Sequence, residues 1–133
     1  MLSKLTWFAM LVLLLQVSVL AADTEREWSS RRGVYKISFE AELDPIEINK
    51  IHAWVLSVRT SRGDPVTAAE ISVLGGMPLH DHGMPTRPRV TEYLGEGRYR
   101  LEGMRCHMNG RWEVSVTVKA DGKVDTAVIA LDL

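Results

Sequence analysis

The sequence contains a single cysteine, Cys106, so no intramolecular disulfide can hold the fold together. An unpaired cysteine in a secreted chain is buried, a ligand, or available for intermolecular pairing, and burial is its commonest state. Helical periodicity is missing too, because no stretch beyond residue 22 sustains apolar spacing of three and four residues. These absences exclude a disulfide-rich scaffold and a helical bundle, and they predict an all-β domain stabilised by its core.

The chain also lacks a strong charge bias and the common catalytic motifs. Its 16 basic and 17 acidic residues are mixed, with no basic run beyond Arg31-Arg32, which argues against nucleic-acid binding. There is no G-x-S-x-G elbow, no glycine-rich phosphate loop before a helix and no H-E-x-x-H motif. Cys106 and His107 are adjacent, so on a strand they face opposite sides and cannot act as nucleophile and base together. We therefore predict that the protein is not an enzyme.

Residues 1–22 have the features of a secretory signal peptide. Lys4 supplies a positive start, residues 5–22 carry no charge, and Leu20-Ala21-Ala22 offers small residues for cleavage. The 18 uncharged residues are at the short end of a bilayer-spanning helix, so an uncleaved membrane anchor is the alternative. We expect cleavage and a periplasmic or secreted protein, attached to the membrane only if the leader is retained.

Cleavage after residue 22 would leave 111 residues, the size of one ordinary domain. Loss of Lys4 leaves 15 basic against 17 acidic residues, a net charge of −2. Residues 23–32 are polar apart from Trp28 and are predicted to form a flexible lead-in. Residues 33–133 are predicted to be the single folded domain.

Alternating apolar and polar residues predict six to eight mostly antiparallel strands in this domain. The strands are expected at 34–41, 51–59, 68–74, 90–94, 98–101 and 112–120, with a last strand after Asp121-Gly122. His52 shares an apolar face with Trp54 and Leu56, which favours a core or edge histidine over a ligand. So many short strands in about 100 residues are typical of an immunoglobulin-like antiparallel β-sandwich.

The last hairpin can be given a register, because Asp121-Gly122 is a strong signal for a two-residue turn. The turn predicts these pairs: Ala120 with Lys123, Val116 with Ala127, Val114 with Ile129, and Trp112 with Leu131. Directly paired residues share a face, so the inward series is apolar until Asp125 near the turn. A slip of one residue would destroy this match.

A second turn is predicted at Asn109-Gly110, between a strand that ends near Cys106 and the strand that begins at Trp112. A three-residue loop would pair Cys106 with Trp112 in the core, turn His107 outward and lift Met108 to the loop tip. A two-residue loop would set apolar residues against charged ones. We therefore favour the three-residue loop.

Soft ligands gather in two segments, Gly75–Pro88 and Cys106–Trp112. Together the segments hold three of the four histidines and three of the four methionines that follow residue 22. The candidate metal ligands are His80, His82, His107, Met77, Met84 and Met108. His80 and His82 are two residues apart, so on extended backbone both imidazoles lie on one side and can converge on one ion. Imidazole with thioether suits copper, above all Cu(I), better than zinc or magnesium.

A structural role for the same residues stays open. The histidines would then bond the loop to the end of the sandwich, while the methionines fill gaps in the core. Cys106 as a thiolate ligand is less favoured, because free cysteines are usually buried and inert. His80 and His107 are 27 positions apart, so a shared metal requires both loops to emerge at the same end of the sandwich.

Both segments resemble the YtkA-like and FixH-like domains. The similarity runs roughly from Ile51 to Val118 and rests on Gly75-Gly76-Met77-Pro78-x-His80-x-His82-Gly83-Met84-Pro85-Thr86, Tyr99, and Met108-x-Gly110-x-Trp112-Glu113. The resemblance implies a small exported or membrane-tethered β-sandwich.

FixH-like members are associated with assembly of copper-containing terminal oxidases. The resemblance therefore implies, as partner, an envelope copper protein or an oxidase assembly factor. FixH-like proteins keep a membrane helix, whereas the leader here has the pattern of a cleavable one. The chain is also similar in style to periplasmic copper chaperones of the β-sandwich type, but their ligand order differs and no site is transferred from them.

Two functions are thus expected from the sequence. The first is an exported, non-enzymatic β-sandwich that binds copper through its His/Met cluster as a carrier or buffer. The second is an envelope structural or protein-interaction module with no metal, in which the loop rich in glycine and proline is a rigid recognition surface.

Overall fold

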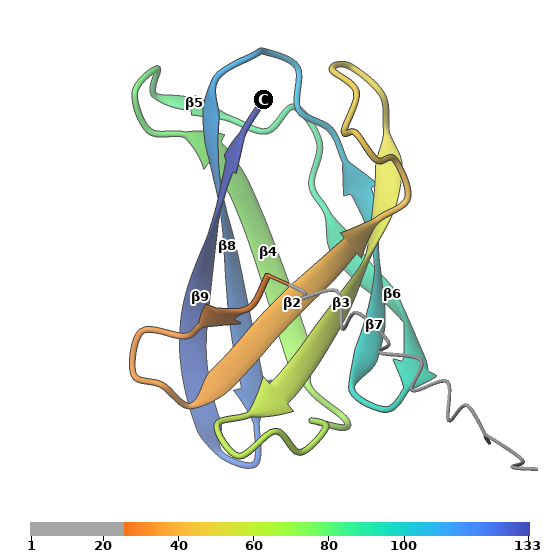
Figure 1. Ribbon diagram of the computed structural model, residues 1–133, viewed down its shortest axis with the longest axis vertical. Coiled ribbons are helices and arrows are strands. Elements are labelled where there is room, and N and C mark those ends of the chain that lie inside the picture. Colours follow the sequence, from red (N-terminus) through yellow and green to blue (C-terminus); the bar gives the residue numbers. More distant parts are fainter. Residues whose placement is uncertain (1–25) are drawn as a thin grey trace, which may run out of the picture.

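The computed structural model describes residues 26–133, which form nine β-strands and no helix (Figure 1). The strands are β1 Trp28–Ser29, β2 Tyr35–Ala41, β3 His52–Thr60, β4 Glu70–Met77, β5 His82–Gly83, β6 Arg89–Gly95, β7 Arg98–Met104, β8 Arg111–Ala120 and β9 Lys123–Asp132. The predicted all-β antiparallel fold is confirmed. The strand count exceeds the expected six to eight because β1 and β5, each of two residues, carry little sequence signal.

The expected leader, residues 1–22, lies outside the described residues. From residue 26 onward, no helix that could cross a membrane is present.

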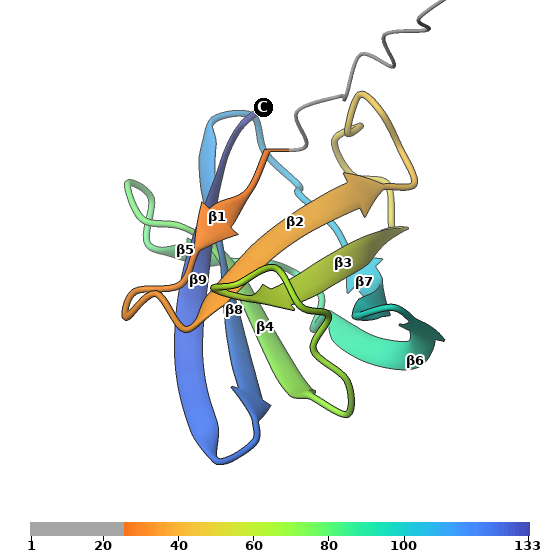
Figure 2. The same ribbon diagram turned by 60° about the horizontal axis from the view of Figure 1, so that its bottom comes forward.

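Two layers of strands pack face to face and join along one side (Figure 2). The order is β1-β2-β3-β7-β6-β4-β8-β9, with β5 paired to β4. The single pair Ser72↔Arg89 connects β4 to β6. The layer that contains β2, β3, β7 and β6 therefore faces the layer that contains β4, β8 and β9, and their apolar side chains meet between them.

The β8–β9 hairpin has the register that the sequence predicts. Its pairs include Ala120↔Lys123, Val116↔Ala127, Val114↔Ile129 and Trp112↔Leu131. Along β8 the inward residues are buried and alternate with half-buried or exposed ones, as the period of a strand requires. Alternation and turn chemistry were therefore sufficient to determine this hairpin.

The predicted hairpin around Asn109-Gly110 is wrong. β7 ends at Met104 and has β3 and β6 on its two sides, whereas β8 has β4 and β9. Neither strand has a free edge for the other, so the chain crosses from one layer to the opposite layer here. Gly110 instead exchanges backbone hydrogen bonds with Leu133, at 2.7 and 3.0 Å.

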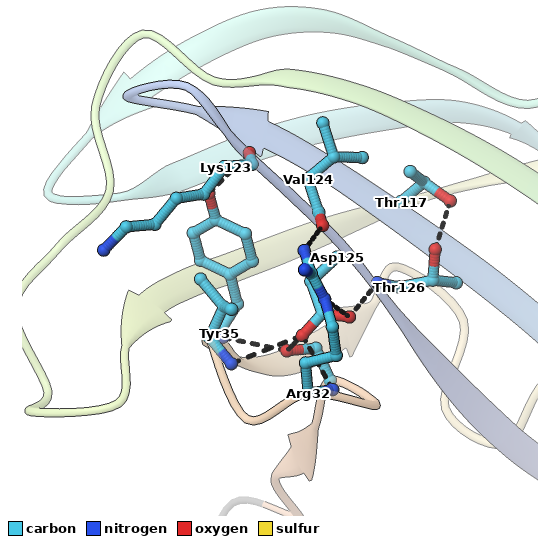
Figure 3. A network of polar contacts seen from close by, with 9 residues as sticks. Arg32, Tyr35, Thr117, Lys123, Val124, Asp125 and Thr126 are labelled. Carbon is cyan, nitrogen blue, oxygen red and sulfur yellow. Dashed lines mark hydrogen bonds and ion pairs between the residues drawn. The ribbon is translucent and has the colours of Figure 1, made fainter.

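Asp125 interrupts the apolar inward series of β9 and ties this strand to the chain that leads into β2 (Figure 3). Its Oδ2 accepts hydrogen bonds from Ser30 Oγ (2.6 Å) and from the backbone N–H groups of Arg32 (2.9 Å) and Val34 (3.3 Å). Its Oδ1 accepts one from the backbone N–H of Thr126 (3.0 Å). Burial raises the pKa of Asp125, but these hydrogen bonds outweigh burial and leave the pKa below its usual value.

The segment 23–32, predicted to be a flexible lead-in, is described only from Arg26. From there it is held against the domain, because β1 pairs with β2 and both Ser30 and Arg32 bind Asp125. No local feature of the sequence indicates this attachment, since the partner carboxylate lies more than 90 residues away.

Candidate metal centre

The first candidate segment begins as a continuation of β4 and not as a loop. β4 runs to Met77, three residues beyond the predicted end, and Gly76 still pairs with Glu113 of β8. The chain then turns back, with the His80 N–H donating to the Met77 carbonyl (3.1 Å). β5 brings His82 opposite Met77. Since directly paired residues share a face, the side chains of Met77 and His82 are neighbours.

The paired glycines of this segment make room for the returning chain. A Cβ at Gly75 would lie 2.5 Å from Cε of Met84, and one at Gly76 would lie 3.1 Å from the His82 carbonyl oxygen. The Met84 N–H donates to the Gly75 carbonyl at 2.9 Å. A side chain at Gly76 would therefore press on the returning backbone, whereas one at Gly75 would require only the flexible end of Met84 to shift.

The second candidate segment, Cys106–Trp112, lies at the same end of the sandwich, where the chain crosses between the layers from β7 to β8 (Figure 1). The Asn49 N–H donates to the Cys106 carbonyl (2.8 Å), and Trp112 Nε1–H donates to the Met108 carbonyl (2.9 Å). The His107 ring packs edge-on against Trp112, with ring centroids 5.5 Å apart. Because Trp112 is fully buried, its contacts hold both the backbone at Met108 and the ring of His107 in place.

Three imidazoles lie in a row across the two segments. The ring centroids of His80 and His82 are 6.5 Å apart, and those of His82 and His107 are 6.3 Å apart. His80 and His82 are exposed, whereas His107 is half-buried. Both segments thus emerge at one end of the sandwich, which a shared site for these histidines requires.

The candidate methionines lie at different depths. Met77 is 1% exposed and packs with Cys106 and Trp112. Met84 is half-buried, and its Sδ accepts the backbone N–H of Arg105 (3.5 Å). Met108 is 36% exposed. Thioethers are therefore present both on the surface and in the buried cluster at this end of the sandwich.

Cys106 is fully buried, as the sequence predicts, although not through the predicted hairpin. Burial raises the pKa of its thiol to about 11. The thiol therefore stays protonated at neutral pH, which is unfavourable for a thiolate ligand.

His52 is also a core residue, as predicted. It is buried, its Nδ1 lies 3.1 Å from the Lys50 carbonyl oxygen, and its Nε2 accepts a hydrogen bond from Trp54 Nε1–H (3.0 Å). Both ring nitrogens are occupied by the protein itself, so His52 differs from the three histidines in the row.

One ring nitrogen in the row has no partner. Nδ1 of His107 is buried and makes no hydrogen bond to any described residue, whereas buried polar atoms are nearly always hydrogen-bonded. Within residues 26–133, no three His, Cys, Asp or Glu side chains are arranged to hold one metal ion. The geometry offers imidazoles in pairs with thioethers nearby, and not the closed four-ligand set of a structural zinc site.

This combination defines a small all-β domain with histidines and methionines collected at one end. The chain belongs to the YtkA-like family, whose sequence model matches residues 31–117 and so includes both candidate segments. Comparison with curated proteins found no match, and comparison with solved structures found none either.

Proposed function

We propose that this protein binds copper at the end of the sandwich where His80, His82 and His107 meet, and that it carries or buffers the ion without catalytic activity. The observation that carries the proposal is the row of three imidazoles, with successive centroids 6.5 and 6.3 Å apart, assembled from two distant segments. Imidazole with thioether donors favours copper. The thioethers come from Met77, Met84 and Met108.

The proposal includes export of the protein to the periplasm or the medium. It is supported by the charge and hydropathy pattern of residues 1–22. The partner would be an envelope copper protein or an oxidase assembly factor, which is what the resemblance to FixH-like proteins implies.

The test of copper binding is a competition titration against a colorimetric Cu(I) chelator. We expect one Cu(I) per chain, and we expect the triple variant His80→Ala/His82→Ala/His107→Ala to lose about 100-fold or more in affinity. Asp81→Asn is the control, because it changes the exposed carboxylate between two of the histidines and should stay within about threefold of the wild type. A stoichiometry near zero in the wild type would contradict the proposal.

A recognition module without metal is the second candidate function. Two exposed apolar side chains support it. Leu79, next to His80 in the sequence, is 81% exposed, and Leu74, which lines the same surface hollow as His82, is 77% exposed. Exposed apolar surface of this kind is available for contact with another protein. In this case the hairpin would contact another envelope protein, and the histidines would serve only to hold the hairpin in place.

The two candidates differ in how His80→Ala/His82→Ala affects the metal-free protein. Both imidazoles are exposed and make no hydrogen bond to another described residue, so Tm should change by no more than about 3 °C. Thermal unfolding with a chelator present measures this. Cu(I) should then raise the Tm of the wild type only. A metal-free loss of roughly 8 °C or more would instead assign the histidines a structural role.

A further inference from the structure

His82 and His107 stand at the separation that two imidazoles need when they bind one ion from opposite sides. A metal–nitrogen bond is about 2 Å long and a ring nitrogen lies roughly 1 Å from the ring centre, so the two centres are then about 6 Å apart. The observed centroid distance is 6.3 Å, with the ring planes at 76°. Since a ring can rotate about its metal–nitrogen bond, this angle does not oppose shared coordination.

Metal ions differ in the number of ligands they require. Zn(II) takes four, and Cu(II) prefers a tetragonal set of nitrogen and oxygen donors, whereas the soft ion Cu(I) accepts fewer and favours sulfur. Within residues 26–133, no third His, Cys, Asp or Glu completes a metal-holding group around any pair. A divalent ion at His82 and His107 would depend on water for the rest of its shell.

The surroundings of this pair also favour a soft ion. His107 packs on the buried ring of Trp112, and the buried Met77 is the cross-strand neighbour of His82, so its thioether lies on the same face. A cation bound at His107 Nδ1 would supply the partner that this buried nitrogen lacks. His80 has none of these features, since it is exposed at the outer end of the row.

From this geometry, and on the basis of the proposed copper function, we infer that the site selects Cu(I) over divalent ions. His82 and His107 are its nitrogen ligands, Met77 contributes the thioether, and His80 is dispensable. Ag(I), which is also soft and monovalent, should bind in the same place.

The inference is tested by titrating Cu(I), Ag(I) and Zn(II) into the wild type and into His80→Ala, His82→Ala and His107→Ala. Cu(I) and Ag(I) should each bind one to one, with Cu(I) about 100-fold or more tighter than Zn(II). His82→Ala and His107→Ala should weaken Cu(I) binding by about 30-fold or more. His80→Ala tests the assignment of His80 and should stay within about threefold if His82 and His107 alone supply the nitrogen ligands. Asp81→Asn, in the exposed turn between the two histidines, is the matched control.

Zn(II) binding as tight as Cu(I) binding would overturn the selectivity. Equal losses in His80→Ala and His82→Ala would overturn the assignment of the ligands. Either result would leave copper carriage standing. If no ion binds the wild type, the proposed function fails and this inference fails with it. Because His107 packs on Trp112, His107→Gln is measured beside His107→Ala, and the metal-free Tm of each variant establishes that it is folded. Full Cu(I) affinity in a folded His107→Gln protein would also overturn the inference.

Discussion

Replacement of Trp112 by alanine is expected to lower the free energy of unfolding by about 3–5 kcal/mol. The indole is fully buried and packs with Met77 and Cys106 beneath the candidate metal centre. Its removal leaves a cavity and also deprives the Met108 carbonyl of its hydrogen-bond donor. For a domain whose stability is about 5–15 kcal/mol, this is a large fraction of the total. Urea denaturation measures the loss.

Trp112→Phe separates packing from the hydrogen bond. Phenylalanine keeps much of the buried ring but cannot donate to the Met108 carbonyl, so we expect a smaller loss of about 1–2 kcal/mol. The Trp112 ring also positions the His107 ring. We therefore expect Trp112→Ala to bind Cu(I) about tenfold more weakly than the wild type, although the indole is not a ligand. Wild-type stability in Trp112→Ala would show that the contacts at this end of the sandwich do not stabilise the fold.

Asp125→Asn should lower Tm at neutral pH by roughly 5–10 °C. The carboxylate accepts four hydrogen bonds, from Ser30, Arg32, Val34 and Thr126. The NH₂ group of an asparagine cannot accept hydrogen bonds, so it would leave some of these O–H and N–H groups without an acceptor. Since Arg32 is largely exposed, its ion pair with Asp125 adds little to the effect.

The effect of Asp125→Asn should depend on pH. The pKa of Asp125 is lowered in the folded protein, so its stabilising contribution is complete above the unfolded-state pKa of about 3.9 and is lost as pH falls through the folded-state value. The Tm difference from wild type should therefore be large near pH 7 and shrink toward about pH 2. Asp121→Asn, in the exposed turn of the same hairpin, is the control and should change Tm little. A Tm difference that stays constant with pH would contradict this account.

Several features of the fold were predictable because they depend on neighbouring residues. The alternation along 112–120 identified the inward face of β8, and Asp121-Gly122 specified the turn, so that together they set the register of the β8–β9 hairpin. The burial of His52 likewise followed from the apolar residues with which it shares a face, and that of Cys106 from the usual burial of free cysteines. The Asn109-Gly110 turn was misassigned because a turn signal does not say which strand will accept the chain that leaves it.

The sequence by itself determined the approximate positions of the seven longer strands, their inward faces and the clustering of His and Met residues in two segments, because strand period and turn chemistry act over a few residues. Only the tertiary structure decided that the rings of His82 and His107, 25 positions apart, would lie 6.3 Å apart and that Met77 would be buried with Cys106 and Trp112. It also decided that Asp125 would bind the chain ahead of β2. These arrangements depend on which strands pair across the two layers, and that choice is made by packing between segments distant in sequence.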